Sequence, residues 1–266
     1  MNSYRSCDAN GNSQEPSAAP RKVRKTALLP ARGRQAPAVP SRPTVDMKRT
    51  RLISACLSFV ACVIFLAAGA QKDEEIARLG KVMGWKAGQV VADVGAGEGE
   101  FGFGAARVVG ETGKVYLTEL DEKKRKALEN EVKRREAKNK IVNVVVVQAA
   151  EKQTNLPDNC CDGIILRRVY HHFTAPDEMD ASLLRSLKPG GVLAVIEFPP
   201  RKGLTESDPV KGVPPNRGGH GIPQKILVAE LTHAGFSVDQ TINDWPDDSY
   251  CVVFRKTAHS RLPPDN

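Results

Sequence analysis

The chain has 266 residues, enough for one α/β domain of about 200 residues with a hydrophobic core and some additional segments. Its net charge of +8 suggests an anionic partner, but residues 1–70 hold 11 Lys/Arg and 3 Asp/Glu, whereas residues 71–266 hold 28 of each. The excess positive charge therefore precedes the predicted domain, and that domain gives no general argument for nucleic-acid binding.

The first 70 residues divide into two segments. Residues 1–46 contain six prolines and no hydrophobic period, so we expect them to be disordered. They form either a transit peptide or sequence upstream of the true start, since Met47 opens a better-formed signal. Residues 47–70 combine a basic start, an apolar run over 52–68 and the end Ala68-Gly69-Ala70, which predicts a secretory signal cleaved after Ala70.

Two readings of residues 47–70 stay open. The apolar run is nearly as long as the roughly 17–25 residues of a membrane-spanning helix, so it either leads the protein into the periplasm or the medium, or anchors it to a membrane. A cytoplasmic or organellar location is the alternative.

The cysteines after residue 70 do not decide the compartment. We expect Cys160, Cys161 and Cys251 to be thiols, with a disulfide to Cys251 as the alternative, because neighbouring cysteines rarely bridge each other.

From residue 73 onward, helical and strand patterns alternate up to a closing strand pair, and residues 259–266 read as a frayed tail. We predict helices over 73–83, 101–109, 122–138, 176–187 and 223–234. We predict strands over 89–94, 114–119, 141–148, 162–166, 192–198, 236–242 and 250–256. The unbroken valines at 144–147 favour a strand buried on both faces. The Lys-Pro-Gly-Gly at 188–191 predicts the end of a helix followed by a turn, and residues 199–221 read as a long loop.

The most informative stretch is residues 90–101. An apolar strand ends at Asp93, and Gly95, Gly97 and Gly99 then lead into a predicted helix. Glycines let the backbone turn tightly and approach a nucleoside ligand, and the helix points its N-terminus at it. A second register, Gly97-x-Gly99-x-x-Gly102, fits the dinucleotide pattern, although its first glycine does not directly follow the strand.

The Asp-x-Gly-x-Gly-x-Gly order resembles motif I of the class I S-adenosylmethionine methyltransferases. The resemblance covers about residues 73–256 and also rests on segments 115–121, 156–162 and 187–191. Residues 168–173, Arg-Val-Tyr-His-His-Phe, are similar to predicted methyltransferase-domain proteins distantly related to the ubiquinone/menaquinone C-methyltransferases. The resemblance implies a Rossmann-like α/β fold: seven mostly parallel strands, helices on both faces and an antiparallel C-terminal strand pair.

The resemblance also implies a cofactor site. Glu119, which ends a predicted strand 26 residues after Asp93, is placed to accept both ribose hydroxyls; the alternative is a solvated helix-capping acid, a role that suits Asp121 better. Relatives commonly have an aspartate near Ala149-Ala150 for the adenine, where only Glu151 or backbone groups could substitute here. The implied cofactor residues are Asp93, Gly95, Ala96, Gly97, Gly99, Glu119, Leu120, Ala150, Glu151 and Arg167.

Acceptor chemistry is expected after the strand at 162–166, because open α/β sheets bind ligands at the carboxyl ends of their strands. We predict Tyr170, His171 and His172 as catalytic residues, with Glu197 as a second base; packing or capping is the alternative role of each histidine. Arg167 and Arg168 could hold an anionic substrate or pair with Glu197 or Asp162.

The sequence therefore predicts a methyltransferase that uses S-adenosylmethionine and an unidentified small-molecule acceptor, without a metal. Two alternatives stay open. A catalytically inactive binding protein would keep the fold, and export fits it because S-adenosylmethionine is made in the cytosol. An NAD(P)-dependent oxidoreductase would use the dinucleotide register.

Overall fold

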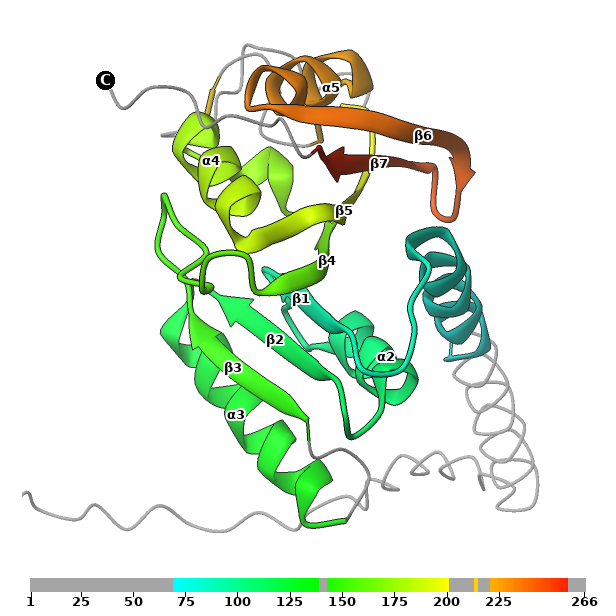
Figure 1. The fold of residues 1–266 in the computed structure, drawn as a ribbon, viewed down its shortest axis with the longest axis vertical. Helices are drawn as coiled ribbons and strands as arrows, with labels where there is room; N and C mark the ends of the chain where they lie inside the picture. Colours follow the sequence, from blue (N-terminus) through cyan, green and yellow to red (C-terminus); the bar gives the residue numbers. More distant parts are fainter. Residues whose placement is uncertain (1–68, 139–142, 201–212, 215–220, 258–266) are drawn as a thin grey trace, which may run out of the picture. The chain divides into compact units, whose positions relative to one another are not determined.

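The computed structural model describes residues 69–138, 143–200, 213–214 and 221–257 (Figure 1). The predicted segment 1–46, nearly all of the predicted signal, most of the loop at 199–221 and the tail at 259–266 lie outside the described residues. The first described helix, residues 69–83, is called the leading helix here, and the predicted cleavage point after Ala70 falls within it.

The elements that follow agree closely with the expected order. The helices are α2 (Glu100–Val109), α3 (Glu122–Glu136), the 3-10 helix η1 (Tyr170–His172), α4 (Pro176–Ser186) and α5 (Gln224–His233). The strands are β1 (Val90–Val94), β2 (Lys114–Glu119), β3 (Val144–Gln148), β4 (Cys161–Arg167), β5 (Leu187–Glu197), β6 (Phe236–Trp245) and β7 (Ser249–Lys256).

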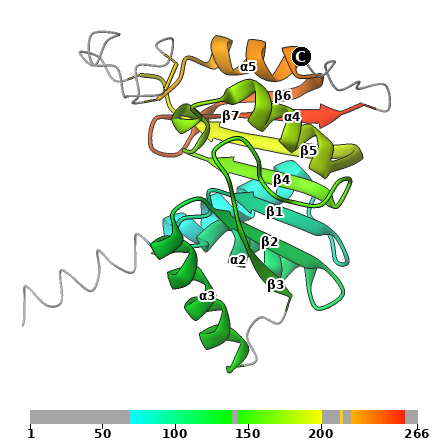
Figure 2. The same ribbon diagram turned by 90° about the vertical axis from the view of Figure 1, so that its left-hand side faces the viewer.

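These strands form one seven-stranded sheet in the order β3-β2-β1-β4-β5-β7-β6, which can be followed in Figure 2. The five strands from β3 to β5 pair in parallel, and β7 pairs antiparallel with both β5 and β6. The order reverses at β1, which lies between β2 and β4. The predicted fold class is thereby confirmed, and the switch point marks where such a sheet binds ligands.

Alternation along the strands explains why helices cover both faces. In β4, Ile165 packs into the core beneath the leading helix, α2 and α3, whereas Ile164 and Leu166 pack beneath α4 and α5. Every one of these three side chains is fully buried. Central strands that are apolar on both faces need a helical layer on each side, which is what the βαβ alternation supplies.

Two expectations about strands were wrong. β3 is not buried on both faces: it is an edge strand, and Val145 is 41% exposed because its face of the sheet edge has no covering helix within the described chain. The segment after α4 is not a turn before the next strand. α4 does stop at Ser186, but residues 188–191 already belong to β5, which enters the sheet through a register shift opposite Cys161 and Gly163.

The cysteines also differ from the expectation. Cys160 and Cys161 form a disulfide between neighbours at the start of β4, where Cys161 is fully buried. Cys251 is a buried free thiol on β7. Within the described residues, no helix is long and apolar enough to cross a membrane.

Candidate cofactor and acceptor site

The loop after β1 is shaped by glycines. Gly95 and Gly97 have φ values of 71° and 57°, in the left-handed region that favours glycine. A Cβ on Gly95 would lie 2.6 Å from Cγ2 of Val169, so no larger residue fits between β1 and the segment after β4. The N–H groups of Gly95 and Ala96 donate to the Thr118 carbonyl at 3.0 and 2.9 Å. The loop is therefore fixed at the carboxyl ends of β1 and β2.

Asp93 lies beneath this loop and is 3% exposed. Its Oδ2 accepts the backbone N–H of Gly102, in the first turn of α2, at 2.9 Å. Burial raises the pKa of the Asp93 carboxyl from 3.8 to about 7, although the Gly102 N–H and the Arg167 charge each lower it. Asp93 is therefore a buried acid that titrates near neutrality at the start of the motif.

Glu119 ends β2 beside the same loop and is 7% exposed. Its carboxylate accepts the N–H groups of Gly97 at 3.2 Å, Leu120 at 3.0 Å and Asp121 at 3.2 Å. The helix-capping role belongs to Asp121 instead, which accepts the Lys124 N–H at 2.8 Å. Glu119 is thus neither solvated nor a cap, and backbone donors fix its orientation.

Two cavities open at this edge. The Glu119 cavity, of about 360 Å³, and the Asp93 cavity, of about 230 Å³, share Gly95, Gly97 and Arg167. Between them they are lined by all of the predicted cofactor residues except one. The exception is Gly99, which lies buried as the N-cap of α2; a Cβ there would come within 3 Å of Phe103 and Leu128.

The predicted adenine end lies along residues 149–151. Leu120 is 52% exposed and gives the Glu119 cavity an apolar wall. The N–H of Ala149 donates to the Glu119 carbonyl at 3.0 Å and that of Ala150 to the Gln153 carbonyl at 2.9 Å, so these two donors are already used. The exposed Glu151 lines the cavity and supplies the acid of this segment.

Arg167 connects the cavities to the leading helix. Its Nε and Nη2 donate to Oε1 and Oε2 of Glu75, both at 2.9 Å, and Glu75 is 4% exposed. The indole N–H of Trp245, at the end of β6, also donates to Glu75 Oε1 at 2.9 Å. The expected partners of Arg167, Glu197 and Asp162, are not the ones found, because the leading helix inserts Glu75 beside Arg167.

Glu75 is the residue that the sequence reasoning missed. A signal existed, since Glu75 precedes the buried Leu79 and Met83 at spacings of four and eight residues and therefore lies on the apolar stripe of the helix. An acid on such a stripe indicates a buried partner, although the pattern does not say which one.

Tyr170 does not fit the predicted catalytic role. Its side chain is fully buried, and its hydroxyl donates to Asp180 at 2.7 Å and to Glu230 at 3.0 Å. Burial raises the pKa of Tyr170 far above its ordinary value, and the two carboxylates raise it further. Tyr170 lines none of the cavities at this edge. The η1 turn instead directs it between α4 and α5, where it ties the two helices together.

His171 forms a buried pair with Glu197, the last residue of β5. Its Nδ1 lies 3.0 and 2.9 Å from the two carboxylate oxygens, and its backbone N–H donates to Oε1 at 3.2 Å. His171 is 4% exposed and Glu197 is fully buried. The ring packs against His172 and, edge-on, against Phe198.

His171 lines a third cavity, called the His171 cavity, of about 520 Å³. Phe198, Pro199 and Pro200 form its apolar wall, and Asp247 and Asp248 of the β6–β7 turn its acidic rim. Arg168 and the exposed His172 line both this cavity and the Glu119 cavity. The two hollows are therefore adjacent; the predicted His172 lies where they meet, and the predicted His171 lines only the second of them.

Arg168 also has partners other than those expected. It has a φ of 56°, unusual for a residue with a side chain, and its Nη2 lies 3.3 Å from Asp247 Oδ2 and 3.2 Å from Ser249 Oγ. Its guanidinium lies over the Phe198 ring, 5.6 Å from the centroid. Asp162 pairs with Lys188 instead. Arg168 thus forms the wall between the two cavities.

Comparisons with known proteins agree with this arrangement. Residues 92–195 match the family model described as a methyltransferase domain. Over 115 residues the chain is 38% identical to the ubiquinone/menaquinone biosynthesis C-methyltransferase UbiE of Escherichia coli, a match covering 43% of this chain and 45% of that protein. The chain thus matches less than half the length of this curated relative.

Solved structures extend the likeness. A SAM-dependent methyltransferase from Aquifex aeolicus aligns with a TM-score of 0.56 and 26% identity, over 68% of this chain and 89% of its own. A putative sarcosine dimethylglycine methyltransferase from Galdieria sulphuraria has the same fold, with a TM-score of 0.56 and 16% identity over 72% of this chain and 87% of its own.

The fold is therefore that of the class I methyltransferases. More particularly, residues 92–195 match the methyltransferase-domain model and are similar to part of a ubiquinone/menaquinone C-methyltransferase. This family implies S-adenosylmethionine as the cofactor, and the residues present fit it. The glycine loop leaves the two cavities open, Glu119 offers a fixed carboxylate for ribose hydroxyls, and Arg167 and Asp93 offer groups of opposite charge for the amino-acid end.

Proposed function

We propose that the protein is an S-adenosylmethionine-dependent methyltransferase that acts on a small-molecule acceptor with a dissociable proton. One observation carries the proposal: the cavity that fits the cofactor adjoins a second cavity lined by His171, whose ring is paired with the buried Glu197, and Arg168 and His172 line both cavities. Adjacent sites for donor and acceptor are what a transfer between two bound molecules requires.

Each part of the cofactor has a candidate partner. Glu119 would accept the ribose hydroxyls, Leu120 would cover one face of the adenine, and Glu151 would accept its amino group. Arg167 and Asp93 would hold the carboxylate and ammonium of the amino-acid end. When bound, S-adenosylmethionine supplies an electrophilic methyl group, and the protein supplies alignment and electrostatics.

The His171–Glu197 pair would remove the acceptor's proton. In the tautomer whose Nδ1–H donates to Glu197, Nε2 would take the proton, and the buried carboxylate would stabilise the imidazolium that results. A phenol, enol or thiol would lose its proton to Nε2 as its O, C or S atom takes the methyl group. Phe198 and the two prolines after it give such an acceptor an apolar surface.

The cofactor site is tested by calorimetric titration of the full chain with S-adenosylmethionine, S-adenosylhomocysteine and NADH. We expect the two adenosyl ligands to bind and Glu119→Ala to abolish this binding. Asp121→Ala is the matched control: it removes a carboxylate two residues away, weakens α3 by about 1 kcal/mol and leaves the ligand affinity unchanged. Binding of NADH alone would instead support the oxidoreductase alternative.

The catalytic assignment is tested by conversion of S-adenosylmethionine to S-adenosylhomocysteine with a panel of phenols, enols and thiols. We expect His171→Gln and Glu197→Gln to lower kcat by about 10²- to 10⁴-fold while the cofactor affinity is kept. The control is His233→Gln, which alters an exposed histidine at the end of α5. Cofactor binding without turnover of any acceptor would support a catalytically inactive binding protein.

Export is the second part of the proposal and rests on the sequence of residues 47–70. We propose that the domain is carried out of the cytoplasm, either cleaved after Ala70 or held by the apolar run. N-terminal sequencing of the protein from each cell fraction tests this. A mature chain that begins at Gln71 in the exported fraction supports cleavage, and a full chain found in the cytosol alone refutes export.

A further inference from the structure

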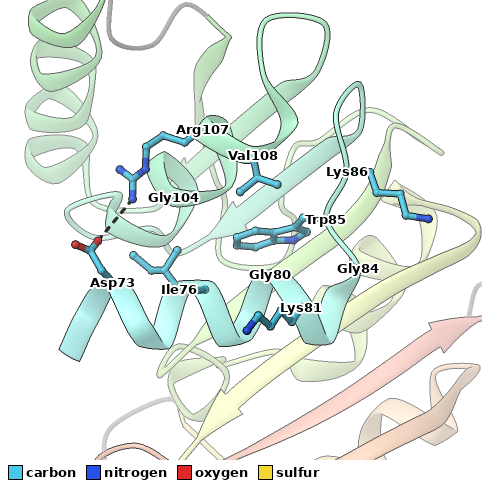
Figure 3. Close-up of a pocket in the computed structure, with 11 residues that line it drawn as sticks. Asp73, Ile76, Gly80, Lys81, Gly84, Trp85, Lys86, Gly104, Arg107 and Val108 are labelled. Carbon is cyan, nitrogen blue, oxygen red and sulfur yellow. Dashed lines mark ion pairs between the residues drawn. The ribbon is translucent and has the colours of Figure 1, made fainter. Parts of the chain in front are cut away.

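A groove unrelated to the three cavities runs between the leading helix and α2 (Figure 3). Its volume is about 730 Å³, within the roughly 300–1,000 Å³ of small-molecule sites. None of the residues that line it lines the Glu119, Asp93 or His171 cavity. The groove is therefore a separate place where a ligand could lie.

The floor of the groove is apolar. Ile76 and Ala77 contribute from the leading helix, Trp85 from the segment after it and Val108 from α2, as Figure 3 shows for three of the four. Val108 is 46% exposed, so its side chain is accessible to a ligand in the groove. Trp85 packs against Gly80, where a Cβ would lie 2.8 Å from an indole carbon, so the glycine lets the indole approach the leading helix closely.

The rim of the groove is basic. It carries Lys81, Lys86 and Arg107 and a single acid, Asp73, which lies 3.7 Å from Arg107. Lys81 and Lys86 are exposed, and neither forms an ion pair with any residue in the described part of the chain. Since residues 71–266 hold 28 bases and 28 acids, this local excess is a property of the groove and not of the domain.

The same two lysines border a second hollow of about 370 Å³. Its other cations are Lys188 and Arg255, which pair with Asp162 and Asp239. Lys81 and Lys86 therefore stand between an apolar groove and a polar, basic hollow. A ligand that spans this boundary would place an apolar body on Trp85 and Val108 and a negative head between the two lysines.

We propose that this groove binds a small amphiphilic anion, that is, a carboxylate or phosphate head on an alkyl or aromatic body. Charge disfavours residues 1–51 as the occupant, because they carry all 11 bases and all 3 acids of the first 70 residues and the rim is also basic. The volume of the groove, about 730 Å³, is that of a small-molecule site. The proposal does not depend on methyl transfer.

The test is calorimetric titration of the full chain with decyl phosphate and decanoate, with and without saturating S-adenosylhomocysteine. We expect saturable binding with and without S-adenosylhomocysteine, and weaker binding at high salt. Binding should also change the tryptophan fluorescence, and Trp85→Phe should remove that change. Lys81→Gln/Lys86→Gln should weaken binding at least tenfold. The matched control is Lys123→Gln/Lys133→Gln, which neutralises two exposed lysines of α3 and should change nothing.

Several results would overturn the proposal. Equal affinity for decanol would remove the need for the anionic head, and equal affinity for inorganic phosphate would remove the need for the apolar body. Binding only to phosphatidylglycerol vesicles would assign the groove to a membrane surface. Val108→Asp provides an independent variant on the apolar side, and undiminished binding by it would place the ligand elsewhere.

Discussion

The buried Asp93 makes the stability of this domain depend on pH in a direction that can be worked out. Its folded pKa of about 7 lies roughly 3 units above the 3.8 of an exposed aspartate. Between these values the unfolded chain releases its proton first, so the folded state binds more protons, and the free energy of unfolding falls as pH rises. At 1.36 kcal/mol per pKa unit, Asp93 alone lowers the free energy of unfolding by about 4 kcal/mol, and this decrease is complete near pH 8.

Urea denaturation of the wild type and of Asp93→Asn, from pH 4.5 to 8.5, isolates this contribution. The asparagine keeps an oxygen for the Gly102 N–H but does not ionise. We therefore expect the difference in unfolding free energy between variant and wild type to grow with pH in favour of the variant and to level off above pH 8. A difference that is independent of pH would mean that Asp93 is not held protonated by burial, and would refute the reasoning.

The same titration bears on the proposed cofactor. A ligand whose ammonium and sulfonium lie near Asp93 favours the ionised carboxylate, so its binding removes the proton. We expect the affinity for S-adenosylmethionine to rise with pH below 7, by up to about tenfold per unit, and to level off above it. An affinity that does not vary between pH 6 and 8 would place the positive groups away from Asp93.

Three further variants test the packing around the site by urea denaturation. Gly102→Ala should destabilise by about 1–3 kcal/mol, because the new Cβ would lie 2.1 Å from a leucine methyl, whereas Gly69→Ala, in a helix with open space around it, should not. Glu75→Ala should cost about 3 kcal/mol by leaving the Arg167 charge without its buried partner; an unchanged midpoint would show that this pair contributes nothing. Tyr170→Phe should cost about 1–3 kcal/mol by removing the donor to two carboxylates, yet leave the affinity for S-adenosylhomocysteine intact. A Tyr170→Phe variant that folds normally but binds no cofactor would show that Tyr170 takes part in cofactor binding.

Local pattern was sufficient for the elements and for the backbone of the glycine loop after β1. The alternation of strand and helix periods placed every strand end within three residues except the start of β5, and for β2 the predicted and observed ends are the same. Gly95, Gly97 and Glu119 were found because their roles are set by nearby backbone: positive φ, a short turn and the carboxyl end of a strand. Asp121 was assigned as the cap of α3 for the same reason.

Side chains whose roles depend on distant segments were not found in this way. Nothing near Arg167 in sequence reveals Glu75, 92 residues earlier, and Tyr170 and His171 are neighbours that the η1 turn sends in different directions. Sheet order likewise decided that β3, as valine-rich as a central strand, lies at an edge. The sequence by itself thus determined the fold and the glycine loop after β1, since both follow from interactions between residues close along the chain. The tertiary structure alone decided which charged groups pair and which side chains face a cavity, because burial and long-range contact depend on how the elements pack.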